Sequence, residues 1–274
     1  MPRLVRIVTC YRQWDNFERW LGHDALFAPD IAWLTVNDDP RDPPPTTTAR
    51  RLTQRGVQIV TSPDNLGRSG ARNLGTAHAH SAWVEHIDGD DLPLPVQPTS
   101  WPAATECDLL QFPTVVAPFN PASSSTERTG SPQPHQPIWT PLTSEIGPID
   151  VRLSATVWSR TFLEKISGYD PRFDGFEDVH LGFKAARAGA RIVHFDSPKQ
   201  VYCQKAGRAT LAPIRVNGSL AFMRWLRTHH PEVASREVSA WLGKELLYQA
   251  VLSPLALIRN LRPVWDYLRW RVLK

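Results

Sequence analysis

Short apolar segments typical of buried β-strands alternate with helix-like segments along the first third of this 274-residue chain. The strand-like segments are residues 5–10, 31–36, 57–60 and 83–87, and the helix-like segments between them are residues 16–27 and 69–80. This alternation predicts an α/β fold with a mostly parallel, Rossmann-like sheet flanked by helices. In such sheets ligands bind beyond the carboxyl ends of the strands, where Thr9, Asp38 and Asp88 fall.

The second half of the chain continues this core after a long interruption. Further strands are expected at residues 109–112, 151–158 and 191–195, and further helices at residues 161–166 and 178–188. Residues 113–148 are rich in Pro, Ser and Thr, which predicts a mobile loop that either covers a site or is plain surface. We therefore expect one domain over residues 1–215 and a C-terminal helical extension over residues 216–274.

The composition argues against several classes of protein. A net charge of +4 without a clustered patch does not indicate nucleic-acid binding. Three cysteines without CxxC spacing suggest neither a disulfide framework nor a zinc site, and they fit a reducing compartment. The sequence has no apolar signal core at its start and no apolar run of about 20 residues, so we expect a cytoplasmic protein without a membrane-spanning helix.

Three carboxylates lie within four residues directly after the fourth strand-like segment. These are Asp88, Asp90 and Asp91. Mg²⁺ and Mn²⁺ take oxygen ligands, and Mg²⁺ is usually held by one or two carboxylates while phosphate oxygens complete its shell. The segment therefore suits a metal-bound diphosphate. It suits equally an acidic turn ended by the prolines that follow, and taken alone it leaves both interpretations open.

Two further segments place charged side chains at the start of helices. Residues 65–75 contain three glycines together with Arg68 and Arg72, so that helix amides and guanidiniums could face an anion. Glu177 and Asp178 open a later helix, where carboxylates are also ordinary capping groups. Each segment by itself is a weak signal.

In this order and spacing, the segments resemble the family-2 glycosyltransferases of the GT-A fold from about residue 4 to residue 195. The matching motifs are Thr9-Cys10-Tyr11, Val36-Asn37-Asp38-Asp39, Asn65-x-Gly67-x-x-x-Ala71-Arg72-Asn73-x-Gly75, Asp88-Gly89-Asp90-Asp91, and Gly168-Tyr169-Asp170 followed by Glu177-Asp178. Five motifs in register are specific where any one would be weak. The resemblance implies a donor that is a nucleoside diphosphate sugar, UDP- or GDP-linked, and a glycan or lipid-linked acceptor.

The resemblance also implies where the donor nucleotide binds. Asp38 would accept hydrogen bonds from the base, and Thr9 and Tyr11 would line the base pocket. Arg72 would help to place the nucleotide. Asp88 would contact the ribose or the metal shell.

The metal and catalytic groups follow from the same resemblance. Asp90 and Asp91, beside Asp88, would hold Mn²⁺ or Mg²⁺ on the donor diphosphate, where the cation stabilises the charge on the leaving group. Asp178 would be the catalytic base that removes the acceptor proton, and Glu177 would shape the acceptor side. Attack from the face opposite the leaving group predicts inversion at the anomeric carbon.

The sequence departs from the family pattern at three places. Asn37 replaces the first acid of the second motif, and Asp39-Pro40 replaces its Gly-Ser. Lys184 stands where the family commonly has Arg, which weakens any bidentate contact there because Lys is only a point charge. No third metal ligand is identified: His194 is near the expected region, but an isolated strand His is more often packed or hydrogen-bonded.

The C-terminal segment is basic and rich in tryptophan. From residue 251 onward, five Lys and Arg residues against one Asp account for the whole net charge of +4. Trp265, Tyr267 and Trp270 lie among them, a pattern that suits contact with the inner face of the plasma membrane. It suits equally a helix that packs its tryptophans on the catalytic domain, and both interpretations stay open.

The leading hypothesis is an inverting, metal-dependent, hexosyltransferase-like glycosyltransferase in bacterial polysaccharide or glycoconjugate synthesis. The alternative is a non-catalytic nucleotide-sugar-binding or scaffold protein of the same fold, against which the intact Asp90 and Asp178 argue. A nucleotidyltransferase on a related sheet would need a glycine-rich segment after the first strand, and residues 9–13 contain no glycine.

Overall fold

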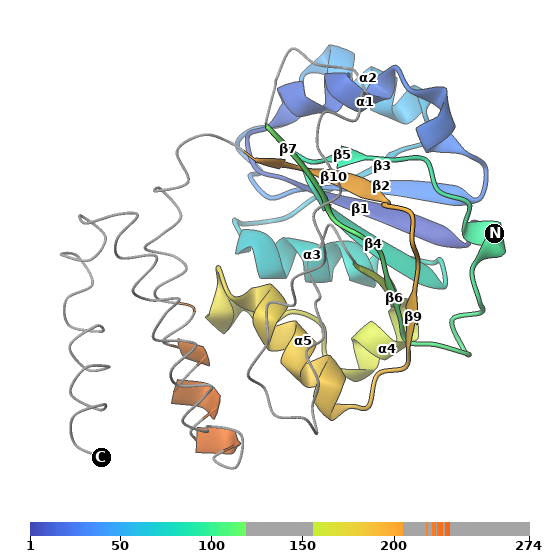
Figure 1. The fold of residues 1–274 in the computed structure, drawn as a ribbon. Coiled ribbons are helices and arrows are strands. Elements are labelled where there is room, and N and C mark those ends of the chain that lie inside the picture. Colours follow the sequence, from blue (N-terminus) through green and yellow to red (C-terminus); the bar gives the residue numbers. More distant parts are fainter. Residues whose placement is uncertain (119–155, 205–217, 219–220, 223, 227, 231–274) are drawn as a thin grey trace.

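A computed structural model of the chain describes residues 1–118, 156–204, 218, 221–222, 224–226 and 228–230 (Figure 1). Its strands are β1 (Leu4–Cys10), β2 (Ile31–Asn37), β3 (Gln58–Thr61), β4 (Trp83–Asp88), β5 (Leu92–Pro93), β6 (Leu109–Gln111), β7 (Val115–Pro118), β8 (Thr156–Ser159), β9 (Ile192–His194) and β10 (Gln200–Gln204). Its α-helices are α1 (Glu18–Leu21), α2 (Thr46–Gln54), α3 (Gly67–Ala77), α4 (Arg160–Lys165) and α5 (Glu177–Arg187). Short 3₁₀ turns are η1 (Trp14–Phe17), η2 (Asp24–Phe27), η3 (Pro98–Ser100) and η5 (Pro171–Phe173).

A seven-stranded sheet in the order β3-β2-β1-β4-β8-β6-β9 forms the centre of the fold. The strands from β3 to β4 are parallel, and β8 runs antiparallel to both of its neighbours. In the register of β1, Thr9 lies opposite Asp88 of β4 and Cys10 lies opposite Asn37 of β2. The carboxyl ends of the three central strands therefore meet at one edge, and the α/β fold predicted from the sequence is confirmed.

Side chains alternate across β1, so each face of the sheet has its own core. Val5 and Ile7 pack with Ala71 of α3, whereas Leu4 and Val8 pack with an aromatic cluster from β2 and the segment between β1 and β2. That cluster includes Trp14, Phe17, Trp20 and Trp33. Figure 1 shows the two layers: α1 and α2 cover one side of the sheet, and α3, α4 and α5 cover the other.

A second, three-stranded sheet has the order β5-β10-β7. β5 begins directly after the acidic residues 88–91 and pairs antiparallel with β10, while β7 pairs parallel with β10. These strands are short and were not predicted from the sequence. β7 lies within residues 113–148, where we expected only a loop, and residues 119–148 lie outside the described part.

Other differences concern the helices. The single helix expected at residues 16–27 is divided into η1, α1 and η2, with a break at Gly22-His23. Helix α2 was not predicted. Within the predicted C-terminal extension, the described residues from 218 to 229 are helical, whereas the basic, Trp-rich end lies outside the described residues. Among the residues that the structure describes, no helix is long and apolar enough to cross a membrane.

Gly75 allows α3 to approach the sheet closely. A Cβ atom at Gly75 would lie 2.4 Å from Cγ2 of Ile7 and 3.1 Å from Cγ2 of Val36. We expect Gly75→Ala to lower the free energy of unfolding by about 1–3 kcal/mol through overpacking, measured by urea denaturation. Gly22→Ala is the control, since a Cβ there meets nothing within 4 Å. A Gly75→Ala midpoint equal to that of the parent chain would contradict this packing.

Candidate active site

The site predicted at the strand ends begins with Asp38, which follows β2 directly. Its backbone N–H donates to the carbonyl of Cys10 at 2.9 Å, which ties the ends of β1 and β2 together. Its carboxylate accepts from the backbone N–H of Leu66 at 2.8 Å and from Ser62 Oγ at 3.3 Å. Burial raises the pKa of Asp38 above its ordinary value. Ser62 carried no signal in the sequence because its role depends on the tertiary approach of the segment after β3.

The pKa of the neighbouring Asp39 is shifted in the opposite direction. Arg12 Nε donates to it at 2.8 Å, and Arg41 donates through its backbone N–H and its Nε. The hydrogen bond from Arg12 is the main reason that the pKa of Asp39 is lowered to about 2. Tyr11 is 43% exposed, and the Arg12 guanidinium lies 5.2 Å from its ring centroid. The segment after β1 therefore presents an aromatic face beside a fixed ion pair.

Arg72 of α3 joins two of the predicted motifs. Its Nη2 donates to Asp88 at 2.9 Å and its Nη1 donates to Glu177 at 2.9 Å, while only 1% of the residue is exposed. Arg68 adds an ion pair to Asp174 at 2.8 Å and a longer one to Glu177 at 3.7 Å. The acidic turn after β4 and the acidic start of α5 thus lie on two sides of one guanidinium.

Asn73, the next residue of α3, anchors the segment that leads to α5. Its Nδ2 donates to the carbonyl of Tyr169 at 2.7 Å, and its Oδ1 accepts from the Tyr169 N–H at 2.9 Å. The Tyr169 hydroxyl shares a hydrogen bond with His86 of β4 at 3.2 Å, and His86 shares another with Thr76 at 3.0 Å. Burial lowers the pKa of His86 to about 3, so the ring is neutral. Asn73 thus satisfies backbone groups, as one interpretation of the glycine-rich segment predicts, whereas the contact of Tyr169 with His86 was not indicated by the sequence.

Glu177 and Asp178 differ in their surroundings. Burial disfavours ionisation of Glu177, but Arg72 and Arg68 outweigh it and hold the pKa of Glu177 below its ordinary value. Its Oε2 is buried and has no hydrogen-bond partner among the residues that the structure describes. Asp178 is partly exposed, and its Oδ1 accepts from the N–H of Val179 at 2.7 Å. The buried acid is therefore fixed by arginines while its neighbour is accessible to a ligand.

The acidic turn divides into exposed and buried carboxylates. The side chain of Asp88 is 34% exposed and Asp90 is partly exposed, whereas Asp91 is 1% exposed. Both oxygens of Asp91 accept hydrogen bonds from β10, and burial, aided by Asp88, raises its pKa well above the ordinary value. These contacts favour a structural role for Asp91 over the metal-binding role expected from the resemblance.

Two carboxylates at one turn fit a hard cation whose remaining ligands come from phosphate oxygens and water. Asp88 and Asp90 provide them. Among the described residues, no group of three or more His, Cys, Asp or Glu side chains is arranged to hold a metal ion by itself. His194 lies in β9 at the far edge of the sheet and gains no support as a further ligand.

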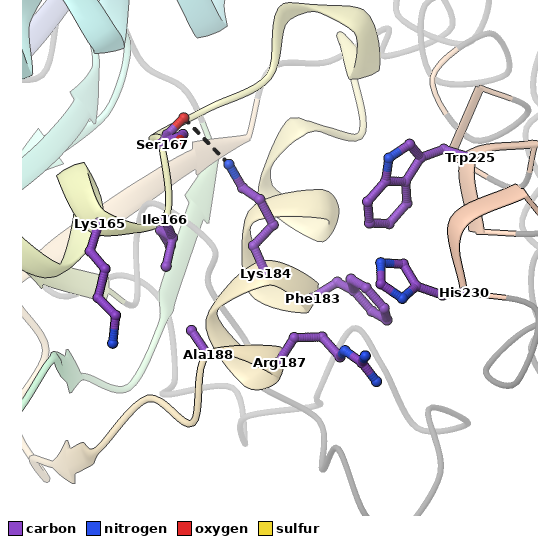
Figure 2. Close-up of a pocket in the computed structure, with 9 residues that line it drawn as sticks. All are labelled: Lys165, Ile166, Ser167, Phe183, Lys184, Arg187, Ala188, Trp225 and His230. Atoms are coloured by element: carbon purple, nitrogen blue, oxygen red, sulfur yellow. Dashed lines mark hydrogen bonds between the residues drawn. The ribbon is translucent and has the colours of Figure 1, made fainter.

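A cavity of about 330 Å³ lies elsewhere, between the end of α4 and the later turns of α5 (Figure 2). Lys165, Lys184, Trp225 and His230 are among its lining residues. Figure 2 shows Lys184 pointing toward Ser167, and its Nζ also donates to the carbonyl of Gly168 at 2.5 Å. Burial lowers the pKa of Lys184 to about 8. In the described part of the chain, the hydrogen bonds of Lys184 are thus made with the turn that follows α4 and not with the strand-end site.

No family model and no curated protein sequence matches the chain. Solved structures do match it. The mannosyltransferase PcManGT from Pyrobaculum calidifontis, in complex with GDP-Man and Mn²⁺, has a TM-score of 0.60 at 16% identity, over 99% of this chain and 80% of that one. TarS of S. aureus has a TM-score of 0.57 at 16% identity, over 91% of this chain. Residues 1–349 of TarS with UDP-GlcNAc have a TM-score of 0.56 at 16% identity, over 91% of this chain and 72% of that one.

This chain spans 43% of the length of the TarS chain. At such identities the likeness establishes the fold. The chain has the GT-A-like, Rossmann-like α/β fold of these structures, as the motifs predicted.

The ion pairs of Glu177 predict a specific dependence of stability on pH. Because its folded pKa is depressed, the stabilisation is present above the unfolded pKa of about 4.3 and is lost as pH falls through the folded value. Glu177→Gln should lower the free energy of unfolding by about 2–4 kcal/mol at pH 7, and the deficit should shrink toward pH 3.

Urea denaturation at a series of pH values measures this deficit. Glu164→Gln is the matched control, since Glu164 forms only a surface pair with Arg160 and should change stability by about 0.5 kcal/mol or less. A deficit for Glu177→Gln that stays constant with pH would show that its ion pairs do not carry the stabilisation.

Proposed function

We propose that the protein is an inverting glycosyltransferase that moves a sugar from a nucleoside diphosphate sugar to a hydroxyl acceptor. The observation that carries the proposal is the position of Arg72, which holds Asp88 and Glu177 on either side of one guanidinium at 2.9 Å each. A donor-side carboxylate and the acid pair of α5 therefore share one site. The fold likeness to structures that contain GDP-Man with Mn²⁺, UDP or UDP-GlcNAc supports the same conclusion.

The donor nucleotide would lie across the ends of β1 and β2. Thr9 and Tyr11 would line the base pocket, and Asp38, already fixed by Leu66 and Ser62, would present its remaining acceptor capacity to the base. Arg72 would act indirectly, since its Nη atoms are engaged by carboxylates. It would hold Asp88 toward the ribose or the metal.

Asp88 and Asp90 would hold Mn²⁺ or Mg²⁺ against the donor diphosphate. When bound, the cation supplies positive charge that stabilises the leaving nucleoside diphosphate. We assign no ligand role to Asp91, because both of its oxygens are engaged by β10. Of the three carboxylates in the turn, those of Asp88 and Asp90 would thus face the ligand, and that of Asp91 faces the protein.

Asp178 would take the proton from the acceptor hydroxyl. Its partial exposure lets an acceptor approach, and a carboxylate within about 3 Å of the hydroxyl can serve as a general base. The buried Glu177 would position the start of α5 and shape the acceptor side through its buried Oε2. Direct attack on the anomeric carbon opposite the diphosphate gives inversion. We propose a hexose donor and a glycan or lipid-linked acceptor in polysaccharide or glycoconjugate synthesis.

Substitution of the two key carboxylates should separate binding from chemistry. Asp178→Asn should lower kcat for sugar transfer by about 10²–10⁴-fold while nucleotide binding in Mn²⁺ stays close to that of the parent chain. Asp90→Asn should weaken both binding and transfer. Asp196→Asn, at an exposed position after β9, is the control and should change neither. Undiminished transfer by Asp178→Asn would reject its assignment as the base.

A thermal-shift panel of nucleoside diphosphate sugars, with and without Mn²⁺, tests the donor class. A donor present at about 100 times its Kd stabilises the folded state by about 2.7 kcal/mol and should raise Tm by several degrees, mainly with Mn²⁺. Asp90→Asn should lose the metal-dependent part of the shift. If no UDP- or GDP-sugar raises Tm, the proposed function is wrong.

A further inference from the structure

The acidic turn at residues 88–91 is braced from the protein side. Arg19 Nη1 donates to the carbonyl of Asp90 at 3.1 Å, and Arg19 is only 7% exposed. Its Nη2 donates to Cys203 Sγ at 3.4 Å, which links the same guanidinium to β10. At Gly89, an added Cβ would lie 3.3 Å from the carbonyl of Thr9, so β1 also lies against the turn. A turn that served only to reverse the chain would not need these buried contacts.

Asp91 makes two further buried contacts with β10. Its Oδ2 accepts from Gln200 Nε2 at 2.9 Å, and its Oδ1 accepts from the backbone N–H of Cys203 at 2.9 Å. Gln200 is fully buried, and it lies 109 residues from Asp91 in the sequence. The Asp91 carboxylate thus ties the acidic turn, at the position next to Asp90, to both the backbone and a side chain of β10.

Gln200 is itself held by a buried chain of charged groups. Lys199 Nζ donates to Gln200 Oε1 at 3.0 Å and to Glu85 Oε1 at 3.1 Å, and Arg6 Nε donates to Glu85 Oε2 at 2.8 Å. All four of these residues are 0% exposed. Buried charges are costly unless they are paired and hydrogen-bonded, so this network of four side chains has one favoured geometry. It fixes the Gln200 amide relative to β1 and β4.

We propose that Gln200 and Arg19 are positioning residues for the metal-binding turn, and this rests on the proposed function. Acting through Asp91 and through the Asp90 carbonyl, they fix the backbone that carries Asp88 and Asp90, so that both carboxylates reach one cation. Cation ligation requires oxygens at narrowly defined distances, and residues that orient the ligands typically change metal affinity by about 10–100-fold. Neither residue touches the cation or the substrate.

Gln200→Met tests the proposal, because it keeps the length of the side chain and removes both the donor to Asp91 and the acceptor for Lys199. The full chain is titrated with Mn²⁺ in the presence of saturating UDP, and in parallel GDP, and free Mn²⁺ is followed by its electron paramagnetic resonance signal. We expect the Mn²⁺ Kd to rise by about 10–100-fold, and transfer at saturating Mn²⁺ to recover most of the parent kcat.

Ser159→Ala is the matched control. It removes a buried hydroxyl of β8 that donates to the carbonyl of Ala104 at 3.2 Å, away from the turn, and it should leave the Mn²⁺ Kd unchanged. If Gln200→Met does not fold, Arg19→Lys takes its place, since it keeps the charge but gives up the paired contacts to Asp90 and Cys203. The expected increase in Kd is the same.

Asp90→Asn distinguishes a failure of the positioning role from a failure of the metal site itself. If Asp90→Asn weakens Mn²⁺ binding but Gln200→Met, or Arg19→Lys in its place, binds Mn²⁺ like the parent chain, the positioning role is overturned and the proposed function stands. A kcat that stays low at saturating Mn²⁺ with an unchanged Kd also overturns it, since a general structural defect would produce that result. If Asp90→Asn leaves Mn²⁺ binding unchanged, the metal site itself is wrong and the inference falls with it.

Discussion

The site depends on the ion pairs that the buried Arg72 guanidinium forms with Asp88 and Glu177. A cation that is 1% exposed must be paired, and its partners are Asp88, 16 residues away, and Glu177, 105 residues away. Tyr169 lies against the same group, with its ring centroid 5.3 Å from the guanidinium carbon. Helix α3 therefore cannot pack on the sheet without bringing the end of β4 and the start of α5 together.

The acidic turn lies between two polar networks of different character. On the α3 side, Arg72 contacts Asp88, whose side chain remains partly exposed. On the other side, Gln200 contacts the buried Asp91, and Arg19 contacts the backbone carbonyl of Asp90. A rigid backbone with exposed carboxylates is what cation binding at a diphosphate requires. The smaller sheet contributes Leu92, Val115 and Val201 to the apolar core, and its strand β10 also supports the acidic turn.

The pKa values of carboxyl groups in this chain are shifted in opposite directions by their environments. Asp38 is buried among hydrogen-bond donors and has a raised pKa, while Asp39 is paired with two arginines and has a pKa of about 2. Asp91 is buried with a raised pKa, and Glu177 is buried beside arginines with a lowered one. Residue type alone does not distinguish these environments. Asp88, Asp90 and Asp178 are more exposed than these four side chains.

The strands of the central sheet, helices α3, α4 and α5, and the meeting of Thr9, Asp38 and Asp88 at one edge could all be predicted from the amino-acid sequence. Those features follow from apolar periodicity and from the geometry of parallel strands, which are local properties of the chain. The contacts of Asp91 with β10, and of Arg72 with both Asp88 and Glu177, became visible in the folded chain. Strands β5, β7 and β10 were likewise missed, because they form a separate sheet by pairing with one another across long distances in the sequence. Such contacts join residues about a hundred positions apart, and no local pattern encodes them.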